Sequence, residues 1–229
     1  MTRPPRVGAV VVAGGVGRRM GRGTDKQFLL LRGIPCVGHS LRALDAHPGV
    51  HEIVVVVRRA NLDRCRRLVR KLALEKVCAI VPSGPRRRDS VVRGLRALGP
   101  ATDIILVHDG ARPCLSAGLL TAVVRSARRY GSGVAAAVVT DTVKRADGLG
   151  RVRDTVDRRG LWTVQTPQAF RASWLREAYR RLPPEAQSVT DDAGAVERMG
   201  RPVRLVCWPG PNPKITRPPD VELVKRLLA

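Results

Sequence analysis

Aromatic residues are scarce in this chain: three tryptophans, two tyrosines and two phenylalanines make up 3% of its 229 residues. Proteins that bind single-stranded nucleic acid stack successive bases on aromatic side chains. So few rings argue against a stacking surface of this kind, although the formal net charge is +23. An arginine-rich nucleic-acid-binding protein is kept as a remote alternative, because neutralising phosphates dominates that affinity.

Lysine is also scarce. Only six of the 42 basic residues are lysine, and the arginines are spread through every segment of the chain. A general bias of composition explains this spread more simply than a local basic patch does. We therefore do not predict a nucleic-acid partner, and we expect the positive field mainly to attract small anionic substrates.

Long apolar runs and paired cysteines are absent. No stretch reaches the roughly 18 to 20 apolar residues that a membrane span needs, and residues 1–6 lead directly into the first apolar run, so we expect no signal peptide. The cysteines contain no C-x-x-C pair: Cys36, Cys65, Cys78, Cys114 and Cys207. An odd, unpatterned set argues against a zinc site and for reduced thiols in a cytoplasmic protein.

Short apolar runs alternate with amphipathic stretches along the whole chain. We expect strands at 7–12, 52–57, 77–81, 103–107, 133–139 and 203–207. We expect helices near 36–46, 61–74, 88–98, 116–130, 171–182, 191–199 and 219–228. The strands are rich in valine and isoleucine without polar alternation, which is typical of a parallel sheet covered on both faces. The chain is therefore predicted to form one α/β domain, 1–229, with a doubly wound, mostly parallel sheet.

One segment interrupts this alternation. Residues 140–168 are polar and rich in turn residues, with a turn signal at Asp147-Gly148. A loop of this length inside a compact domain is usually functional. We therefore expect the segment to reach a partner or a ligand.

A glycine-rich loop, AGGVGRRMG at 13–21, follows the first predicted strand and precedes Asp25-Lys26-Gln27. Ligands of open α/β sheets bind at the carboxyl ends of strands. Glycines let backbone N–H groups approach an anion, and the neighbouring basic residues add positive charge. The spacing fits neither a P-loop nor the dinucleotide fingerprint, in which the third glycine would come one residue earlier. An ordinary glycine-rich turn is the alternative interpretation.

Two further clusters follow predicted strands. His108-Asp109-Gly110-Ala111-Arg112-Pro113 places a carboxylate and a guanidinium beside the glycine loop. Asp109 is suited to hold a substrate hydroxyl or help position Mg²⁺, or, alternatively, to cap nearby N–H groups in a turn. Ser90 lies early in the helix after the third strand, where a hydroxyl suits an anionic ligand. Thr190, taken alone, is predicted to be a helix N-cap.

Together these segments resemble the 2-C-methyl-D-erythritol 4-phosphate cytidylyltransferases of the non-mevalonate isoprenoid pathway. The resemblance runs from about residue 7 to residue 228. Its markers are AGGVGRRMG, DKQ, HDGARP, DTVKR, TVDRxGLW, QTPQ, TDD and KITRP. It implies a Rossmann-like domain whose protruding β-arm, residues 140–168, forms a homodimer. It also implies that CTP and methylerythritol phosphate give diphosphocytidyl-methylerythritol and pyrophosphate, with Mg²⁺ bridging phosphate oxygens.

The resemblance also implies roles for individual residues. The catalytic residues would be Arg19, Lys26, Arg158 and Lys214. CTP would be bound by Ala13, Gly14, Gly15, Arg19, Lys26, Gly84, Arg87 and Ser90. The acceptor would be bound by Asp109, Arg112, Thr142, Arg158, Thr166, Thr190 and Lys214. Asp109 is the candidate metal ligand, phosphate oxygens alone being the alternative, and the arm residues Arg158 and Thr166 would reach the neighbouring subunit's site.

The chain departs from the family pattern at Pro85, where many relatives carry a polar residue. Contacts to the base would then come from Gly84, Arg87 or the main chain. Arg159 follows Arg158 directly, which leaves open which guanidinium reaches the substrate; we favour Arg158 because it follows Thr-Val-Asp. The nearest alternative function is that of a ribitol-5-phosphate cytidylyltransferase, which shares the loop, the HDxxRP turn and the arm. Sugar-1-phosphate nucleotidylyltransferases are more distant.

Overall fold

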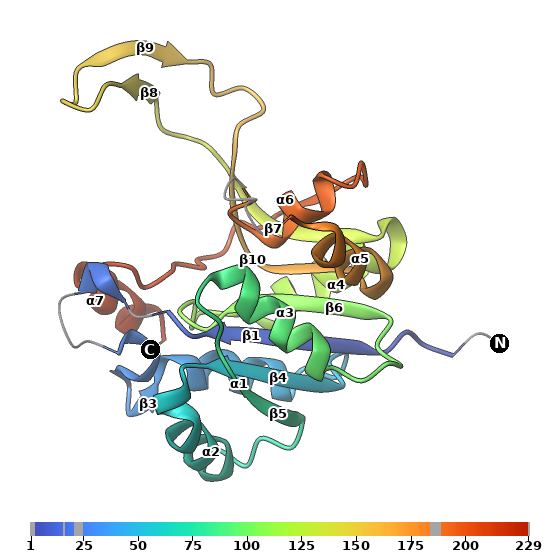
Figure 1. Ribbon diagram of the computed structural model, residues 1–229. Coiled ribbons are helices and arrows are strands. Elements are labelled where there is room, and N and C mark those ends of the chain that lie inside the picture. Colours follow the sequence, from blue (N-terminus) through green and yellow to red (C-terminus); the bar gives the residue numbers. More distant parts are fainter. Residues whose placement is uncertain (1–2, 16, 21–24, 184–188, 229) are drawn as a thin grey trace.

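A seven-stranded sheet forms the centre of the molecule (Figure 1). The computed structural model describes residues 3–15, 17–20, 25–183 and 189–228. The strands, in spatial order, are β11 (Leu205–Cys207), β7 (Ser132–Val138), β10 (Trp162–Arg171), β6 (Ile104–Asp109), β1 (Val7–Ala13), β4 (Glu52–Val57) and β5 (Val77–Pro82). All pairings are parallel except those of β10, which runs antiparallel to both β6 and β7. The predicted α/β fold with a mostly parallel sheet is confirmed.

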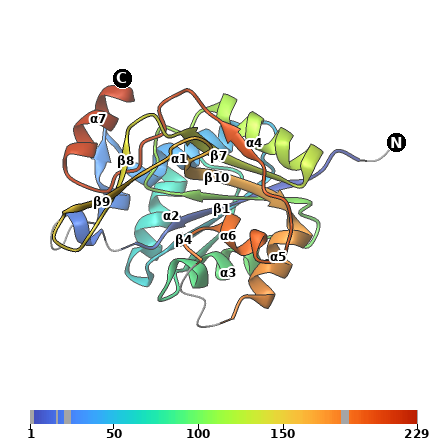
Figure 2. The ribbon, with the colours of Figure 1, turned by 90° about the horizontal axis from the view of Figure 1, so that it is seen from above.

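The central strands are apolar because helices cover both of their faces (Figure 2). All seven residues of β1 and all six of β4 are buried. The helices are α1 (Cys36–Ala46), α2 (Leu62–Lys71), α3 (Arg87–Ala97), α4 (Ala117–Tyr130), α5 (Ala172–Arg181), α6 (Asp192–Glu197) and α7 (Pro219–Leu227). One apolar core lies between the sheet and α1, α2 and α4, and a second lies between the sheet and α3, α5 and α6. Among the described residues, no helix has the length and apolar character needed to cross a membrane.

A smaller core lies beneath the C-terminal helix. Leu31 of the short hairpin β2 (Leu30–Leu31) and β3 (Ile34–Pro35) packs there with Cys36, Ile215 and Val224 of α7. Ile215 is fully buried, and its backbone N–H donates to the carbonyl of Ala111 at 2.9 Å. The segment before α7 is thereby fixed to the turn that follows β6.

The segment 140–168 divides into two parts, so the predicted boundary of the arm was wrong at its C-terminal side. The hairpin of β8 (Val143–Ala146) and β9 (Val152–Val156) stands away from the body (Figure 1). Residues 162–168 instead belong to β10 in the central sheet. Polar residues and Pro167 conceal this strand in the sequence, because proline cannot donate to a strand ladder. The structure accommodates the proline where the β7–β10 register shifts, between Val164 and Gln168.

Close packing between β7 and α4 depends on Gly133. A Cβ atom at this position would lie 2.3 Å from the carbonyl oxygen of Val123 in α4. We expect Gly133→Ala to lower the free energy of unfolding by about 1–3 kcal/mol, because the helix backbone must shift. Gly148→Ala is the matched control, since nothing lies within 4 Å of its Cβ position. Denaturant unfolding of both variants tests this, and equal midpoints would contradict it.

Candidate active site

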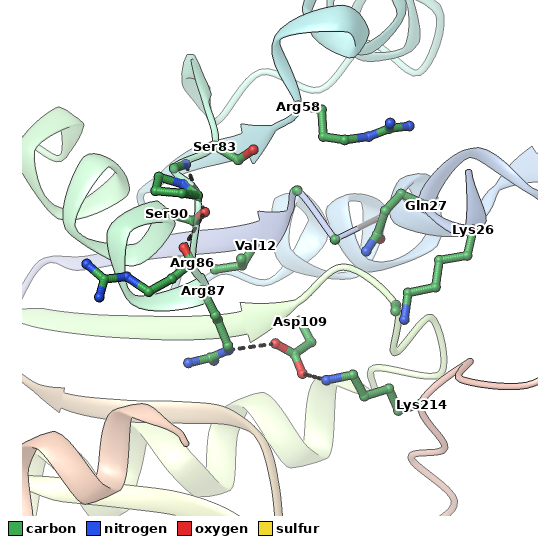
Figure 3. A pocket seen from close by; sticks show the side chains of 15 residues that line it. Val12, Lys26, Gln27, Arg58, Ser83, Arg86, Arg87, Ser90, Asp109 and Lys214 are labelled. Carbon is green, nitrogen blue, oxygen red and sulfur yellow. Dashed lines mark hydrogen bonds and ion pairs between the residues drawn. The ribbon is translucent and has the colours of Figure 1, made fainter. Parts of the chain in front are cut away.

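Two neighbouring cavities open at the carboxyl ends of the parallel strands. The larger has a volume of about 580 Å³, and Figure 3 shows its lining side chains. Its lining residues are Val12, Gly14, Gly15, Lys26, Gln27, Arg58, Ser83, Gly84, Pro85, Arg86, Arg87, Ser90, Asp109, Ala111 and Lys214. The smaller, of about 240 Å³, is lined by Arg87, Asp109, Arg112, Val164, Gln165, Thr166, Gln168, Thr190, Asp191 and Lys214. Arg87, Asp109 and Lys214 line both cavities and so form their common wall.

The larger cavity contains most of the residues predicted to bind the nucleotide. Gly14 packs so closely that a Cβ atom there would lie 2.4 Å from Cβ of Ser83, whereas Gly15 faces open space. The Ser90 hydroxyl accepts from the N–H of Gly84 at 3.1 Å and donates to the carbonyl of Arg86 at 3.2 Å. Ser90 therefore shapes the loop between β5 and α3.

Two of the residues predicted to bind the nucleotide lie outside the cavity lining. Ala13 is the buried last residue of β1. Arg19 is exposed in a short helical turn within the glycine-rich loop. It is close enough to Lys26 to affect that ammonium electrostatically.

Lys26 is a buried cation, with 8% of its surface exposed. Its ammonium donates to the carbonyl of Ile215 at 3.0 Å, and it makes no ion pair with any described carboxylate within 4.0 Å. Burial lowers the pKa of Lys26, and the nearby positive charges of Lys214 and Arg19 add to this effect, while Asp109 opposes it. An arriving anion would relieve the electrostatic cost of this charge.

Asp109 lies between two cations at the end of β6 (Figure 3). Its Oδ1 accepts from Nε of Arg87 at 3.4 Å, and its Oδ2 accepts from Nζ of Lys214 at 2.5 Å. Burial alone would raise the pKa of Asp109, but Arg87 and Lys214 together hold it well below its usual range. The carboxylate is therefore ionised and can accept hydrogen bonds from a polar ligand.

The smaller cavity contains five of the residues predicted for the acceptor: Asp109, Arg112, Thr166, Thr190 and Lys214. Arg112 donates from Nη1 to the carbonyl of Asn212 at 2.6 Å, and the Thr166 hydroxyl accepts from the N–H of Asp109 at 3.0 Å. The expectation that Thr166 belongs to the arm was wrong: it lies in β10 and lines the cavity of its own chain. Thr190 is not the N-cap of α6, because Asp191 accepts from the N–H of Gly194 at 3.0 Å.

Thr142 and Arg158 do not reach either cavity of their own chain. Both are exposed on the hairpin segment, where Arg158 donates from Nη1 to the carbonyl of Thr140. The neighbouring Arg159 is engaged with Asp157, at 2.8 Å between Nε and Oδ2.

Several lining residues were not found from the sequence. Arg58 follows β4 at the same edge of the sheet, so the rule that ligands bind at strand ends could have found it. Its Nη2 donates to Asp25 at 2.7 Å, and Asn61 donates to the same oxygen at 2.6 Å. Gln27 lies inside the recognised DKQ motif. Gln165 and Gln168 lie inside the recognised QTPQ motif, of which only Thr166 was assigned to the site.

The described residues offer little to a resident metal ion. No group of three or more His, Cys, Asp or Glu side chains is placed to hold one in this part of the chain. Asp109 is the only acidic side chain lining the larger cavity among the described residues, and cations face both of its oxygens. The donor set fits a divalent cation that takes most of its oxygen ligands from a substrate.

A glycine loop and a cation-lined cavity at the carboxyl edge of a mostly parallel sheet define a nucleotide-binding α/β transferase with room for a second substrate. The model of the family described as IspD, 2-C-methyl-D-erythritol 4-phosphate cytidylyltransferase, matches residues 7–229. The chain belongs to this family, and it is a nucleotidyltransferase of isoprenoid biosynthesis by the methylerythritol phosphate pathway.

Individual relatives agree with this assignment. The 2-C-methyl-D-erythritol 4-phosphate cytidylyltransferase of Pelotomaculum thermopropionicum is 47% identical over 224 residues, which cover 97% of this chain and 94% of that enzyme. The enzyme of the same name from Geobacillus kaustophilus is 40% identical, with 96% of each chain covered. The crystal structure of the Thermus thermophilus enzyme matches with a TM-score of 0.79 at 30% identity, covering 97% of this chain and 98% of the other.

His108, next to Asp109, is fully buried. Its Nε2 lies 3.1 Å from the carbonyl of Arg112 and its Nδ1 lies 3.3 Å from the Thr166 hydroxyl. The Thr166 oxygen already accepts from the N–H of Asp109, so its hydroxyl can donate to Nδ1 while Nε2–H donates to Arg112. Burial lowers the pKa of His108 from 6.5 to about 4, although Asp109 opposes the shift.

We expect His108 to make stability depend on pH. Between pH 6.5 and 4 the unfolded chain binds a proton at this residue that the folded chain excludes, so acidification through this window costs about 3 kcal/mol of stability. Above pH 6.5 the ring is neutral in both states and the cost is absent. Denaturant unfolding of the parent and of His108→Gln at several pH values measures this difference. Parallel pH profiles would contradict it.

Proposed function

We propose that the chain transfers the cytidylyl group of CTP to the phosphate of 2-C-methyl-D-erythritol 4-phosphate and releases pyrophosphate. The observation that carries the proposal is the pair of cavities with a common wall of Arg87, Asp109 and Lys214. The glycine loop lies on the larger side, which suits the triphosphate. The smaller, more polar side suits a polyol phosphate. Membership of the family supports this pairing of substrates.

The reaction needs positioning and charge neutralisation more than covalent chemistry. A phosphate oxygen of the acceptor attacks the α-phosphorus of CTP, and the bond from that phosphorus to the oxygen bridging to the β-phosphate breaks. Pyrophosphate leaves opposite the attacking oxygen, and no enzyme-bound intermediate is required. Because two anions must approach one another, fixed cations and correct alignment supply most of the catalysis.

Lys26 and Arg19 are the proposed cations for the triphosphate. Lys26 lies in the wall of the larger cavity without a carboxylate partner within 4.0 Å among the described residues. Its ammonium can therefore turn to a phosphate without breaking an ion pair. Arg19 is exposed beside it. The N–H groups near Gly14 and Gly15 can approach the phosphates because no side chain stands in the way.

Asp109 and Lys214 are proposed to hold the acceptor. The ionised Asp109 carboxylate can accept from the polyol hydroxyls, and Lys214 can move from Asp109 to the acceptor phosphate. Arg112, Thr166 and Thr190 line the rest of this cavity. Mg²⁺ is the proposed cofactor. Phosphate oxygens of the substrates, with Asp109 as the candidate protein ligand, would hold it, and it would neutralise negative charge on the triphosphate.

The hairpin is proposed to complete the acceptor site of a second subunit. Its apolar side chains are left in water by a single chain, with Leu149 80% exposed and Val152 61% exposed. We propose that residues 140–161 of the single domain form the dimer arm and carry Thr142 and Arg158 to the partner. Arg158 suits this role better than Arg159, because Arg159 is already paired with Asp157.

A pyrophosphate-release assay tests the proposed acceptor. We expect release to require CTP, Mg²⁺ and methylerythritol phosphate together, because the attacking phosphate and the triphosphate must occupy adjoining cavities. Omitting any one should abolish turnover. Ribitol 5-phosphate at the same concentration is the control acceptor. Equal rates with both acceptors would contradict the assignment and favour a ribitol-5-phosphate cytidylyltransferase.

Subunit mixing tests the shared site. Arg158→Ala and Lys214→Ala should each lower turnover by at least about tenfold, since each removes a cation from the acceptor phosphate. In a heterodimer of the two variants, one site recovers both cations if Arg158 acts in trans. We therefore expect partial recovery of activity after the subunits are mixed. Native mass spectrometry shows whether heterodimers form. If they form but are no more active than the two variant homodimers, Arg158 does not act in the neighbouring subunit's site.

A further inference from the structure

Asp192 is a buried carboxylate that lies in the TDD motif but was given no role in the site. It opens α6, and none of its surface is exposed. Nη2 of Arg87 donates to its Oδ2 at 2.7 Å, and the hydroxyl of Tyr179 donates to its Oδ1 at 2.6 Å. Burying a charge is costly unless it is paired and hydrogen-bonded, and both oxygens of Asp192 are satisfied.

Arg87 divides its guanidinium between two carboxylates. Its contact with Asp192, at 2.7 Å, is short, whereas its contact with Asp109, at 3.4 Å, is at the limit of a hydrogen bond. Asp192 therefore determines where the guanidinium lies. The group stays on the common wall of the two cavities, on the side of Asp109 opposite to Lys214 (Figure 3).

The pairing is a long-range one. Arg87 begins α3, and Asp192 lies 105 residues further along the chain. Tyr179 comes from a third helix, α5, and burial followed by the charge of Asp192 raises its pKa, so its hydroxyl remains a donor. Side chains from three helices on one face of the sheet thus form one hydrogen-bonded chain, from Tyr179 through Asp192 to Arg87 at the site.

We propose that Asp192 is a positioning residue for the transfer reaction, because it holds Arg87 at the boundary where the two substrate phosphates meet. This inference rests on the function proposed above. A cation at that boundary stabilises the state in which two anions are closest more than it stabilises either bound substrate alone. Without Asp192, Arg87 would be left with Asp109 and would form a full ion pair with it.

A double-mutant cycle on the full-length protein tests the proposal. We expect Asp192→Asn to lower kcat for pyrophosphate release from CTP and methylerythritol phosphate about tenfold or more, with each KM changed less than about threefold. In an Arg87→Ala background the same substitution should change kcat less than about twofold, because its effect passes through Arg87. Asp63→Asn, which removes an exposed carboxylate paired with Arg66 on α2, is the control and should leave kcat unchanged.

Additive effects of Asp192→Asn and Arg87→Ala would overturn the proposal, since a merely structural carboxylate would matter equally with and without Arg87. Thermal unfolding of each variant identifies chains that do not fold. If Asp192→Asn is one of them, Tyr179→Phe replaces it in the cycle. Tyr179→Phe removes one hydrogen bond to Asp192, should lower kcat less, and should lose its effect once Arg87 is alanine. A parent protein that releases no pyrophosphate would refute the proposed function instead.

Discussion

The structure of the site depends on one carboxylate held between two cations. Asp109 ends the central strand β6, and its side chain is almost completely buried between Arg87 and Lys214. A charge in that position is tolerable only when opposite charges compensate it. Arg87 comes from the start of α3, and Lys214 comes from the segment before α7. The ion-pair cluster thus joins three distant parts of the chain at one edge of the sheet, and it forms the wall that separates the two cavities.

The cations around this wall differ in whether a carboxylate faces them, and this difference affects how substrates bind. Arg87 and Lys214 face carboxylates, so a phosphate must compete with Asp109 or Asp192 for them. Among the described residues, the Lys26 ammonium donates to the neutral carbonyl of Ile215 and makes no ion pair, and burial, followed by the charge of Lys214, lowers its pKa. An incoming polyphosphate can therefore pair with Lys26 without displacing a described carboxylate. On the proposed function this favours the triphosphate in the larger cavity.

Much of the fold could be predicted because valine-rich runs identify buried parallel strands such as β1 and β4 without reference to the rest of the chain. Gly14, Gly84 and Asp109 could be placed at the site for a related reason: each follows or ends such a strand, and these ends meet at one edge of the sheet. β10 could not be predicted in this way. Its Gln165–Gln168 stretch is polar and contains Pro167, and only its position between β6 and β7 makes it a central strand. The partnership of Arg87 with Asp192 was equally inaccessible, because no local pattern connects residues 105 positions apart.

Strand β10, which was not predicted from the sequence, also connects the hairpin to the site. β10 returns from the hairpin into the sheet and brings Thr166 against the backbone N–H of Asp109 at 3.0 Å, while Asn212 donates to the carbonyl of the same threonine at 2.9 Å. A displacement of the hairpin that moved β10 along its own axis would shift Thr166 relative to Asp109, and the segment leading to Lys214 with it. On the proposed function, docking of the arm would therefore do more than bring two contact residues to the partner's site. Holding the hairpin in place would also stabilise the acceptor cavity of the subunit from which the hairpin extends.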